Sequence, residues 1–338
     1  MQVTSFVLVA LTSFTSANCA SQERAVAAHS ITEAVVDGEL RTRIHTEEFA
    51  GGGRKLEEGQ REIRPGEWIR HGSYVSYYPT GRKNAEGNYT DSQKTGTWTY
   101  WYANSKKEAE GAYVAGVPDG PWTFANENGR TRQAGSFVAG RASGEWTYYW
   151  PLTGKLRARG SFAEGAMVGT WTYFDENEKR AEEGRFEAGV RTGEWTAWHP
   201  NEQLASRGAF SAGKRHGAWT YWHDDGSEAK RGSYTAGLED GPWTFSYPGG
   251  KPQQSGAFAA GLEEGPWTFW FPDGNKSEEG GFSKGLAEGR WTLWHANGRK
   301  ASTGEYRAGR AQGEWIVWDS DGTEQSRRRF DEGRLVSR

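Results

Sequence analysis

Aromatic and β-branched residues recur along the chain at a fixed spacing, and glycines flank each group. The unit reads Gly-x-Trp-Thr-[Tyr/Phe]-Trp-x-x-x-Gly, passes through a short polar stretch into Gly-x-[Phe/Tyr]-x-x-Gly, and then begins again. The step is 24 residues, except for one step of 25 that contains Pro151-Leu152-Thr153. A fixed period of this length indicates a repeat architecture, in which each unit buries its apolar face against its neighbours. The first glycines of the eleven units are Gly72, Gly96, Gly120, Gly144, Gly169, Gly193, Gly217, Gly241, Gly265, Gly289 and Gly313.

Two strands are predicted in each repeat. Residues 98–102 are of the aromatic and β-branched types that strands prefer, and residues 110–114 form a second, shorter run. Pairs such as Asn128-Gly129 and Asp225-Gly226 lie between the two runs and are typical of hairpin turns. One hairpin is only marginally stable, so consecutive hairpins are expected to pair edge to edge. The predicted fold is all-β: an elongated, twisted, single-layer antiparallel sheet of tandem 24-residue β-hairpin repeats, about 11 units in all.

One series of tryptophans is expected to hold the sheet together. Side chains alternate across a strand, so Trp98 and Tyr100 share one face. A glycine in the second strand, such as Gly111, leaves room for an indole to lie on the backbone. We interpret the first aromatic position of the repeat as a structural ladder. Its members are Trp98, Trp122, Trp146, Trp171, Trp195, Trp219, Trp243, Trp267, Trp291 and Trp315.

A second tryptophan series is expected on the opposite face. Other repeats carry Ala125, Tyr149, Phe174 or Ser246 at this position, so packing constrains it less than the ladder position. It is the candidate binding surface, and the alternative is a second, looser packing face. Its members are Trp101, Trp198, Trp222, Trp270, Trp294 and Trp318.

The N-terminal residues indicate export. Residues 1–20 are interpreted as a signal peptide or a lipoprotein leader, because the apolar run 5–14 is too short to span a bilayer and small residues follow it. Cys19, the only cysteine, lies where a bacterial lipoprotein carries its lipid, and it is the candidate lipidation site. The predicted location is the periplasm, the outer membrane as a lipoprotein, or the medium after secretion.

Two further segments follow the leader. Residues 21–65 lack the repeat and contain a glycine run and many charges, which predicts a flexible linker or tether. Residues 66–338 form the repeat array. Arg328 replaces the mid-strand glycine in the last repeat, and a charged final strand is typical of a C-terminal cap.

The sequence offers no constellation for catalysis. Residues 208–214 fit the phosphate-loop spacing up to the lysine, but Arg215 stands where that loop needs Ser or Thr. His199 and His223 share one repeat position and lie about 9.6 Å apart, too far to hold one zinc ion. We predict no catalytic residue, no metal site and no cofactor. The net charge of −3 and the pI of about 6.2 provide no basic field for nucleic acid.

The repeat resembles the variant MORN repeat (membrane occupation and recognition nexus), in the bacterial form called the YwqK-type antitoxin repeat. The resemblance rests on Gly-x-Trp-Thr-x-Trp-x-x-x-Gly followed by Gly-x-Tyr-x-x-Gly, as in residues 289–313, and it covers residues 66–335. It implies a twisted sheet of successive hairpins that is used for protein or lipid contact.

Near-identical repeats present one long, uniform surface, whereas catalysis needs a single asymmetric site. The predicted function is that of a non-catalytic exported binding or scaffold protein, which uses a repeated aromatic surface for protein–protein or envelope contacts. Two alternatives stay open: a glycan- or cell-wall-binding repeat module, because exposed aromatic rings suit sugars, and an antitoxin or immunity-type protein. The expected partner is a protein, with a glycan or a membrane surface as alternatives and no nucleic acid.

Overall fold

The computed structural model describes residues 29–37 and 40–337. Every regular element in these ranges is a β-strand, and twenty-six strands are assigned to one open antiparallel sheet of tandem hairpins. The all-β fold of tandem hairpins predicted from the sequence is thus confirmed. No helix long and apolar enough to cross a membrane occurs in the described ranges. The chain divides into two compact parts: an N-terminal part (1–117 and 127–129) and a C-terminal part (118–126 and 130–338).

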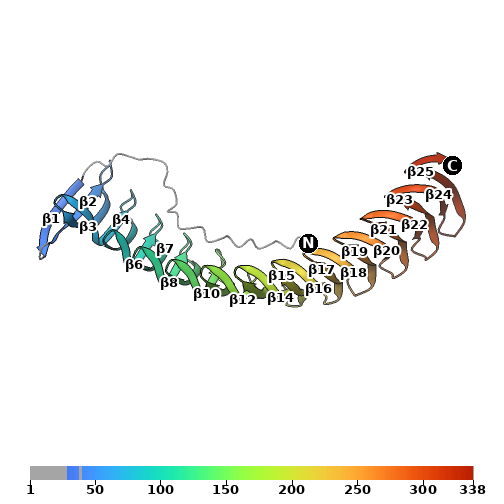
Figure 1. Cartoon of the computed structure of the whole chain (residues 1–338), viewed down its shortest axis with the longest axis horizontal. Coiled ribbons are helices and arrows are strands. Elements are labelled where there is room, and N and C mark those ends of the chain that lie inside the picture. The colour runs from blue at the N-terminus through green and yellow to red at the C-terminus, as the bar shows by residue number, and fades with distance from the viewer. Residues whose placement is uncertain (1–28, 38–39, 338) are drawn as a thin grey trace. The chain divides into compact units, whose positions relative to one another are not determined.

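The strands of the N-terminal part each pair antiparallel with the next one along the chain (Figure 1). They are β1 (His29–Asp37), β2 (Leu40–Glu48), β3 (Arg54–Arg64), β4 (Glu67–Tyr77), β5 (Lys83–Thr90), β6 (Gln93–Trp101) and β7 (Lys107–Val114).

The prediction of a flexible tether over residues 21–65 is wrong for the part that forms β1 to β3. β2 and β3 pair from Thr42 opposite Arg61 to Glu48 opposite Arg54, and the glycine run 51–53 is the turn between them. The aromatic repeat does not reach these strands, which is why the sequence pattern did not reveal them. The predicted leader 1–20, with Cys19, lies outside the described residues.

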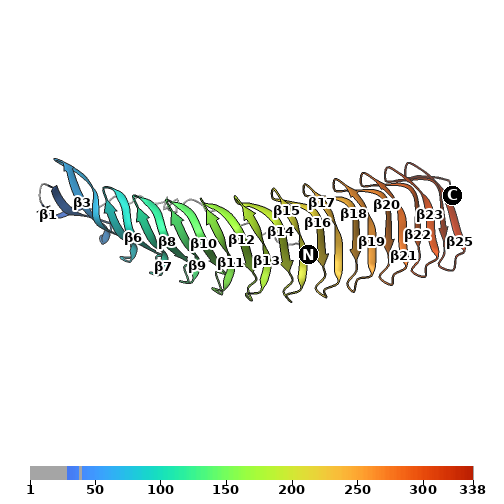
Figure 2. The ribbon, with the colours of Figure 1, turned by 60° about the horizontal axis from the view of Figure 1, so that its bottom comes forward.

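In the C-terminal part the strands again succeed one another in chain order, side by side (Figure 2). They are β8 (Val117–Ala125, in this part from residue 118), β9 (Thr131–Val138), β10 (Arg141–Tyr149), β11 (Leu156–Ala163), β12 (Ala166–Phe174), β13 (Arg180–Glu187), β14 (Val190–Trp198), β15 (Leu204–Ser211), β16 (Lys214–Trp222), β17 (Glu228–Thr235), β18 (Leu238–Ser246), β19 (Pro252–Ala259), β20 (Leu262–Trp270), β21 (Lys276–Ser283), β22 (Leu286–Trp294), β23 (Lys300–Arg307), β24 (Arg310–Trp318), β25 (Glu324–Asp331) and β26 (Arg334–Ser337).

The tightest turns are the return loops that lead from one repeat to the next. Ala212 and Gly213 both have positive φ, 49° and 77°, as two-residue turns matched to the twist of the strands require. Asp225-Gly226 lies at the other end of a hairpin, as predicted, but in a longer loop where only the glycine has a positive φ. The Asp225 carboxylate instead accepts a hydrogen bond of 2.8 Å from Ser227 N. The tight two-residue turn is therefore formed by Ala212-Gly213, and not by Asp225-Gly226.

The first tryptophan series lies buried against glycine. Its ten indoles keep between 0% and 9% of their surface exposed. Trp195 pairs with Gly184 across β13 and β14, and a Cβ added to this glycine would lie 2.1 Å from Trp195 Cδ2. The same fit recurs at Gly208 beneath Trp219. These glycines therefore provide the space in which an indole of the following repeat lies on the backbone.

Hydrogen bonds and ring contacts fix these indoles further. Trp195 Nε1 donates to Arg185 O at 3.2 Å, and eight more ladder indoles make the equivalent bond at 3.0–3.2 Å. Phe186 meets Trp195 edge to face, with ring centroids 5.2 Å apart, and Phe210 does so from the other side at 5.8 Å. Such pairs contribute roughly 0.5–1.5 kcal/mol beyond the area that they bury.

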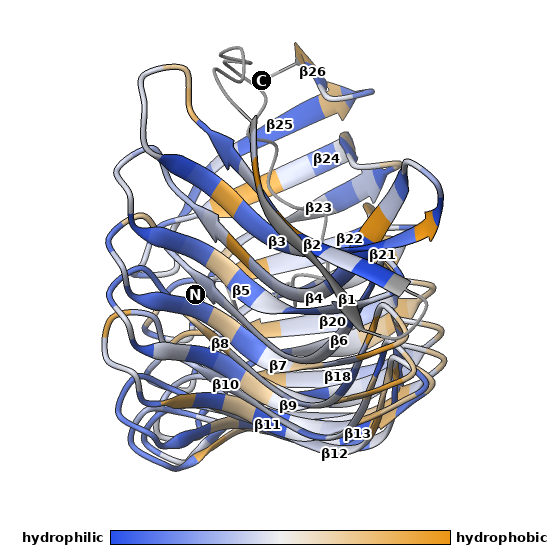
Figure 3. Cartoon of the chain, turned by 90° about the vertical axis from the view of Figure 1, so that its left-hand side faces the viewer, coloured by the Kyte–Doolittle hydropathy of each residue, from blue (hydrophilic) through white to orange (hydrophobic). Residues whose placement is uncertain are grey.

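The core is aromatic rather than aliphatic. Blue and pale colours dominate the strands in Figure 3, and orange is confined to short segments. The hydropathy scale used there ranks Trp and Tyr as mildly hydrophilic, so a ladder of indoles and phenols leaves no orange band. The mean hydropathy of −0.86 has the same origin. The sheet therefore obtains its burial from large rings on bare backbone, as the composition predicts.

Candidate functional site

The second tryptophan series is half-buried in the structure. Its members follow the ladder tryptophans by three positions, and side-chain alternation places them on the face opposite the ladder. The series consists of Trp101, Trp198, Trp222, Trp270, Trp294 and Trp318. Half-buried indoles combine a fixed orientation with accessible ring surface, which suits contact with another molecule.

Cations from the preceding hairpin cover part of this row. The Arg180 guanidinium lies 4.5 Å from the ring centroid of Trp198, and the ammonium groups of Lys83 and Lys276 lie 5.6 and 5.7 Å from Trp101 and Trp294. A cation over an indole face is attracted by the ring quadrupole. The row is thus a mixed surface of aromatic rings and positive charges.

Side chains of the preceding repeat also bond the backbone of this row. His199 Nε2 lies 2.9 Å from Trp222 O, and His295 Nε2 lies 2.9 Å from Trp318 O. Tyr247 reaches Trp270 O in the same way through its hydroxyl. These histidines therefore link one repeat to the next. No cluster of three potential metal ligands occurs within the described residues.

Three repeats lack the stacked aromatic ring beside the ladder indole and carry Ala197, Leu293 or Val317 in its place. Ala197 stands where most repeats have the Tyr or Phe that stacks beside the ladder indoles, and Glu182 lies opposite it in the register of β13 and β14. The carboxylate of Glu182 accepts two hydrogen bonds from Arg191, of 2.7 and 2.9 Å. The Arg191 guanidinium lies 3.9 Å from the ring centroid of Trp195. An ion pair therefore covers the indole where the aromatic ring is missing.

Burial of the stacked phenols changes their titration. It raises the pKa of Tyr148 to about 12, and it also raises the pKa values of Tyr173 and Tyr221. Lys230 lies 4.6 Å from the ring centroid of Tyr221, and burial lowers the pKa of its ammonium group. Both effects arise because the charged form loses water on the packed face.

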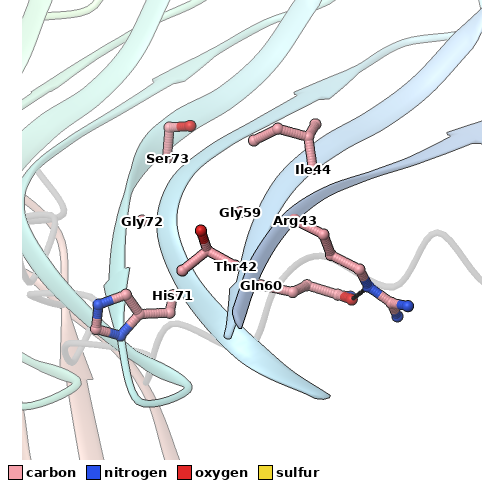
Figure 4. Close-up of a pocket in the computed structure, with 8 residues that line it drawn as sticks. All are labelled: Thr42, Arg43, Ile44, Gly59, Gln60, His71, Gly72 and Ser73. Atoms are coloured by element: carbon pink, nitrogen blue, oxygen red, sulfur yellow. Dashed lines mark hydrogen bonds between the residues drawn. The ribbon is translucent and has the colours of Figure 1, made fainter. Parts of the chain in front are cut away.

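A shallow hollow lies between β2, β3 and β4 (Figure 4). Arg43 Nε donates to Gln60 Oε1 at 2.7 Å across its floor. Beside it, the buried carboxylate of Glu58 accepts hydrogen bonds from Arg70 Nε at 2.6 Å and from Gln60 Nε2 at 2.8 Å. The sequence did not predict this polar network, because it lies largely in the segment interpreted as a tether.

One hairpin, formed by β4 and β5, matches a known repeat family. Residues 70–91 match the family model of the MORN repeat variant. The MORN-variant repeat predicted from the sequence is thereby confirmed at this position, whereas the antitoxin association stays a prediction. No curated protein matches the chain.

Two solved structures share a weak likeness with the chain. The crystal structure of TcdB2-TccC3-Cdc42 matches with 11% sequence identity and a TM-score of 0.18, covering 86% of this chain. The crystal structure of TcdB2-TccC3 without the hypervariable C-terminal region matches with 10% identity and a TM-score of 0.18, covering 82% of this chain. The chain spans only 16% of the length of each, and at these scores the likeness bears on neither fold nor function.

Proposed function

We propose that this chain is a non-catalytic scaffold protein that is exported and binds a protein partner through its second tryptophan row. The observation that carries this proposal is the contrast between the two tryptophan series. The ladder indoles are buried and hydrogen-bonded within the sheet, whereas the second row keeps ring surface accessible. Aromatic side chains held in a fixed orientation are frequent anchors of protein interfaces.

The spacing of the row favours an extended partner. Consecutive repeats carry second-row residues two strands apart, or about 9.6 Å. Trp270 and Trp294 are such neighbours, as are Trp198 and Trp222. A partner that contacts several repeats gains affinity from each of them, without a single deep pocket.

The test compares binding by single and double variants. The purified chain is immobilised and exposed to envelope fractions, and bound protein, glycan and lipid are scored separately. For a protein partner identified in this way, Trp198→Ala and Trp222→Ala should each weaken binding about tenfold, and the double variant should weaken it further. Leu152→Ala, at a side chain that is 83% exposed, is the matched control and should leave the affinity unchanged.

Other outcomes separate the alternatives. Retention of glycan alone, lost in the double variant, would favour a cell-wall-binding module. A partner whose toxicity the chain suppresses would favour an immunity protein. Equal affinity of the double variant and the wild type would reject the second row as a binding surface. Mass spectrometry of the native N-terminus tests export, which an intact Met1 would contradict.

A further inference from the structure

Three leucines stand exposed in consecutive repeats of the C-terminal part, each as the first residue of a strand. Leu238, Leu262 and Leu286 begin β18, β20 and β22, with 50%, 49% and 50% of their surface exposed. Each leucine side chain lies beside the return loop of the next repeat. A Cβ added to Gly261 would lie 3.5 Å from Leu238 Cδ2, and the same distance separates a Cβ added to Gly285 from Leu262 Cδ2 and one added to Gly309 from Leu286 Cδ2. The three side chains therefore form one apolar ridge.

A row of carboxylates runs beside the ridge on the same face. In β18, Leu238 pairs with Thr235 and Asp240 pairs with Ser233, so the two side chains point to the same side of the sheet. Glu264 and Glu288 hold the position of Asp240 in the next two repeats. Their cross-strand partners, Ala257 and Gly281, are as small as Ser233. The leucine–carboxylate strip consists of Leu238, Asp240, Leu262, Glu264, Leu286 and Glu288.

Packing alone does not account for the strip. Other repeats carry Gln93, Val117, Arg141, Ala166, Val190, Lys214 or Arg310 at the leucine position, and Thr95, Asp119, Ser143, Val168, Thr192, His216 or Gln312 at the carboxylate position. A position that the fold required to be leucine would be leucine throughout the array. The strip also ends in basic residues on both sides, at Lys214 and Arg310, so its negative charge is local.

The carboxylates of the strip are held in place. Glu264 Oε2 accepts a hydrogen bond of 2.8 Å from Lys284 N, and Glu288 Oε2 accepts one of 2.8 Å from Ala308 N. Asp240 Oδ2 accepts a hydrogen bond of 3.0 Å from the Thr235 hydroxyl. A carboxylate fixed in this way loses little conformational freedom when it pairs with a cation.

We propose that the strip binds a basic amphipathic α-helix of a partner protein. Its leucines recur every two strands, about 9.6 Å apart. Residues i and i+7 of an α-helix share a face and lie about 10.5 Å apart, so helix side chains at this spacing match the ridge. In an extended segment residues i and i+3 lie about 10 Å apart but point to opposite faces. Lys or Arg beside the apolar stripe of the helix pairs with the carboxylate row.

This site is separate from the tryptophan row. Leu262 is the first residue of β20 and Trp270 is its last, so the two rows run along opposite ends of the strands. Either surface binds its partner without the other.

Synthetic peptides test the proposal on the full chain. The probe is a fluorescent helix-forming peptide with leucine at every seventh position and lysine beside each leucine. Saturable binding is expected, weakened about tenfold by Leu262→Ser. Val190→Ser, at the same repeat position but outside the strip, should bind like the wild type. Glu264→Gln keeps an acceptor for Lys284 N, and it should weaken binding and reduce its dependence on salt.

Several results would overturn the proposal. One is equal binding of a peptide of the same composition whose leucines are scattered around the helix. Another is unchanged affinity in both Leu262→Ser and Glu264→Gln, each checked for native circular dichroism. Self-association of the chain that Leu262→Ser abolishes would instead make a second copy the occupant. Binding to zwitterionic lipid vesicles that the same substitution abolishes would make it a membrane surface.

Discussion

The indole of Trp219 lies on the backbone of Gly208, so closely that a Cβ on this glycine would lie 2.2 Å from Trp219 Cδ2. Gly208→Ala is therefore expected to lower the free energy of unfolding by about 1–3 kcal/mol, because ring and methyl group compete for one space. Urea midpoints measure the loss. In a Trp219→Ala background the same substitution should cost less, since the ring is gone. Equal costs in both backgrounds would contradict this packing.

Trp219→Ala should destabilise the chain more than Trp222→Ala. Trp219 is 4% exposed and its Nε1 donates to Ala209 O at 3.0 Å, whereas Trp222 is half-buried. Loss of a buried large aromatic side chain typically costs about 3–5 kcal/mol. Comparison of the two urea midpoints gives the answer, and equal or reversed shifts would refute the assignment of the two faces.

Alkaline pH should destabilise the aromatic ladder. The pKa of Tyr148 is about 12 in the folded chain and about 10 in an unfolded one, so its contribution is complete below about pH 10 and is lost as the pH rises towards 12. The lowered pKa of Lys230 acts in the opposite direction, at pH values below its ordinary pKa of about 10.5. Tyr148→Phe should therefore lose less stability between about pH 9 and about pH 11 than the wild type. Parallel pH profiles of the two proteins would argue against a buried phenol.

The histidine that links two repeats is replaced by a tyrosine at the same position of another repeat. His199 Nε2 bonds Trp222 O, and Tyr247 makes the equivalent bond to Trp270 O with its hydroxyl. His199→Tyr should therefore keep the stability within a few tenths of a kcal/mol, whereas His199→Phe should lose about 1 kcal/mol. Thermal unfolding of both variants distinguishes them. A loss of the same size in both would point to ring packing instead of the hydrogen bond.

The tryptophan ladder could be predicted because the same packing of an indole on a glycine recurs with the period of the sequence. Trp at one position and Gly at another recur in the sequence, and both are needed wherever an indole lies on the backbone. Strands β1 to β3 could not be predicted in this way, because they carry no such signature and Glu58 occupies a buried position. A buried carboxylate is recognisable only with its partner, and Arg70 lies on the next strand.

The candidate surfaces were only partly predictable. The second tryptophan row followed from the alternation of side chains. The leucine–carboxylate strip did not, because leucine and a carboxylate occur together at these positions in only three consecutive repeats, so the period of the array does not mark them. Alternation places Leu262 and Glu264 on one side of the sheet, but only the structure shows that the leucine side chain is exposed.

The packing of an indole on a glycine of the preceding repeat also gives the array a direction from its N-terminal to its C-terminal end. The indole of Trp219 lies on Gly208 of the preceding repeat, so the glycine always comes before the ring in the sequence. A ladder tryptophan packs on backbone that precedes it in the chain, so the sheet can extend from its N-terminal side one repeat at a time. The ring of the following strand, such as Tyr234 for Trp219, then covers the other side of the indole.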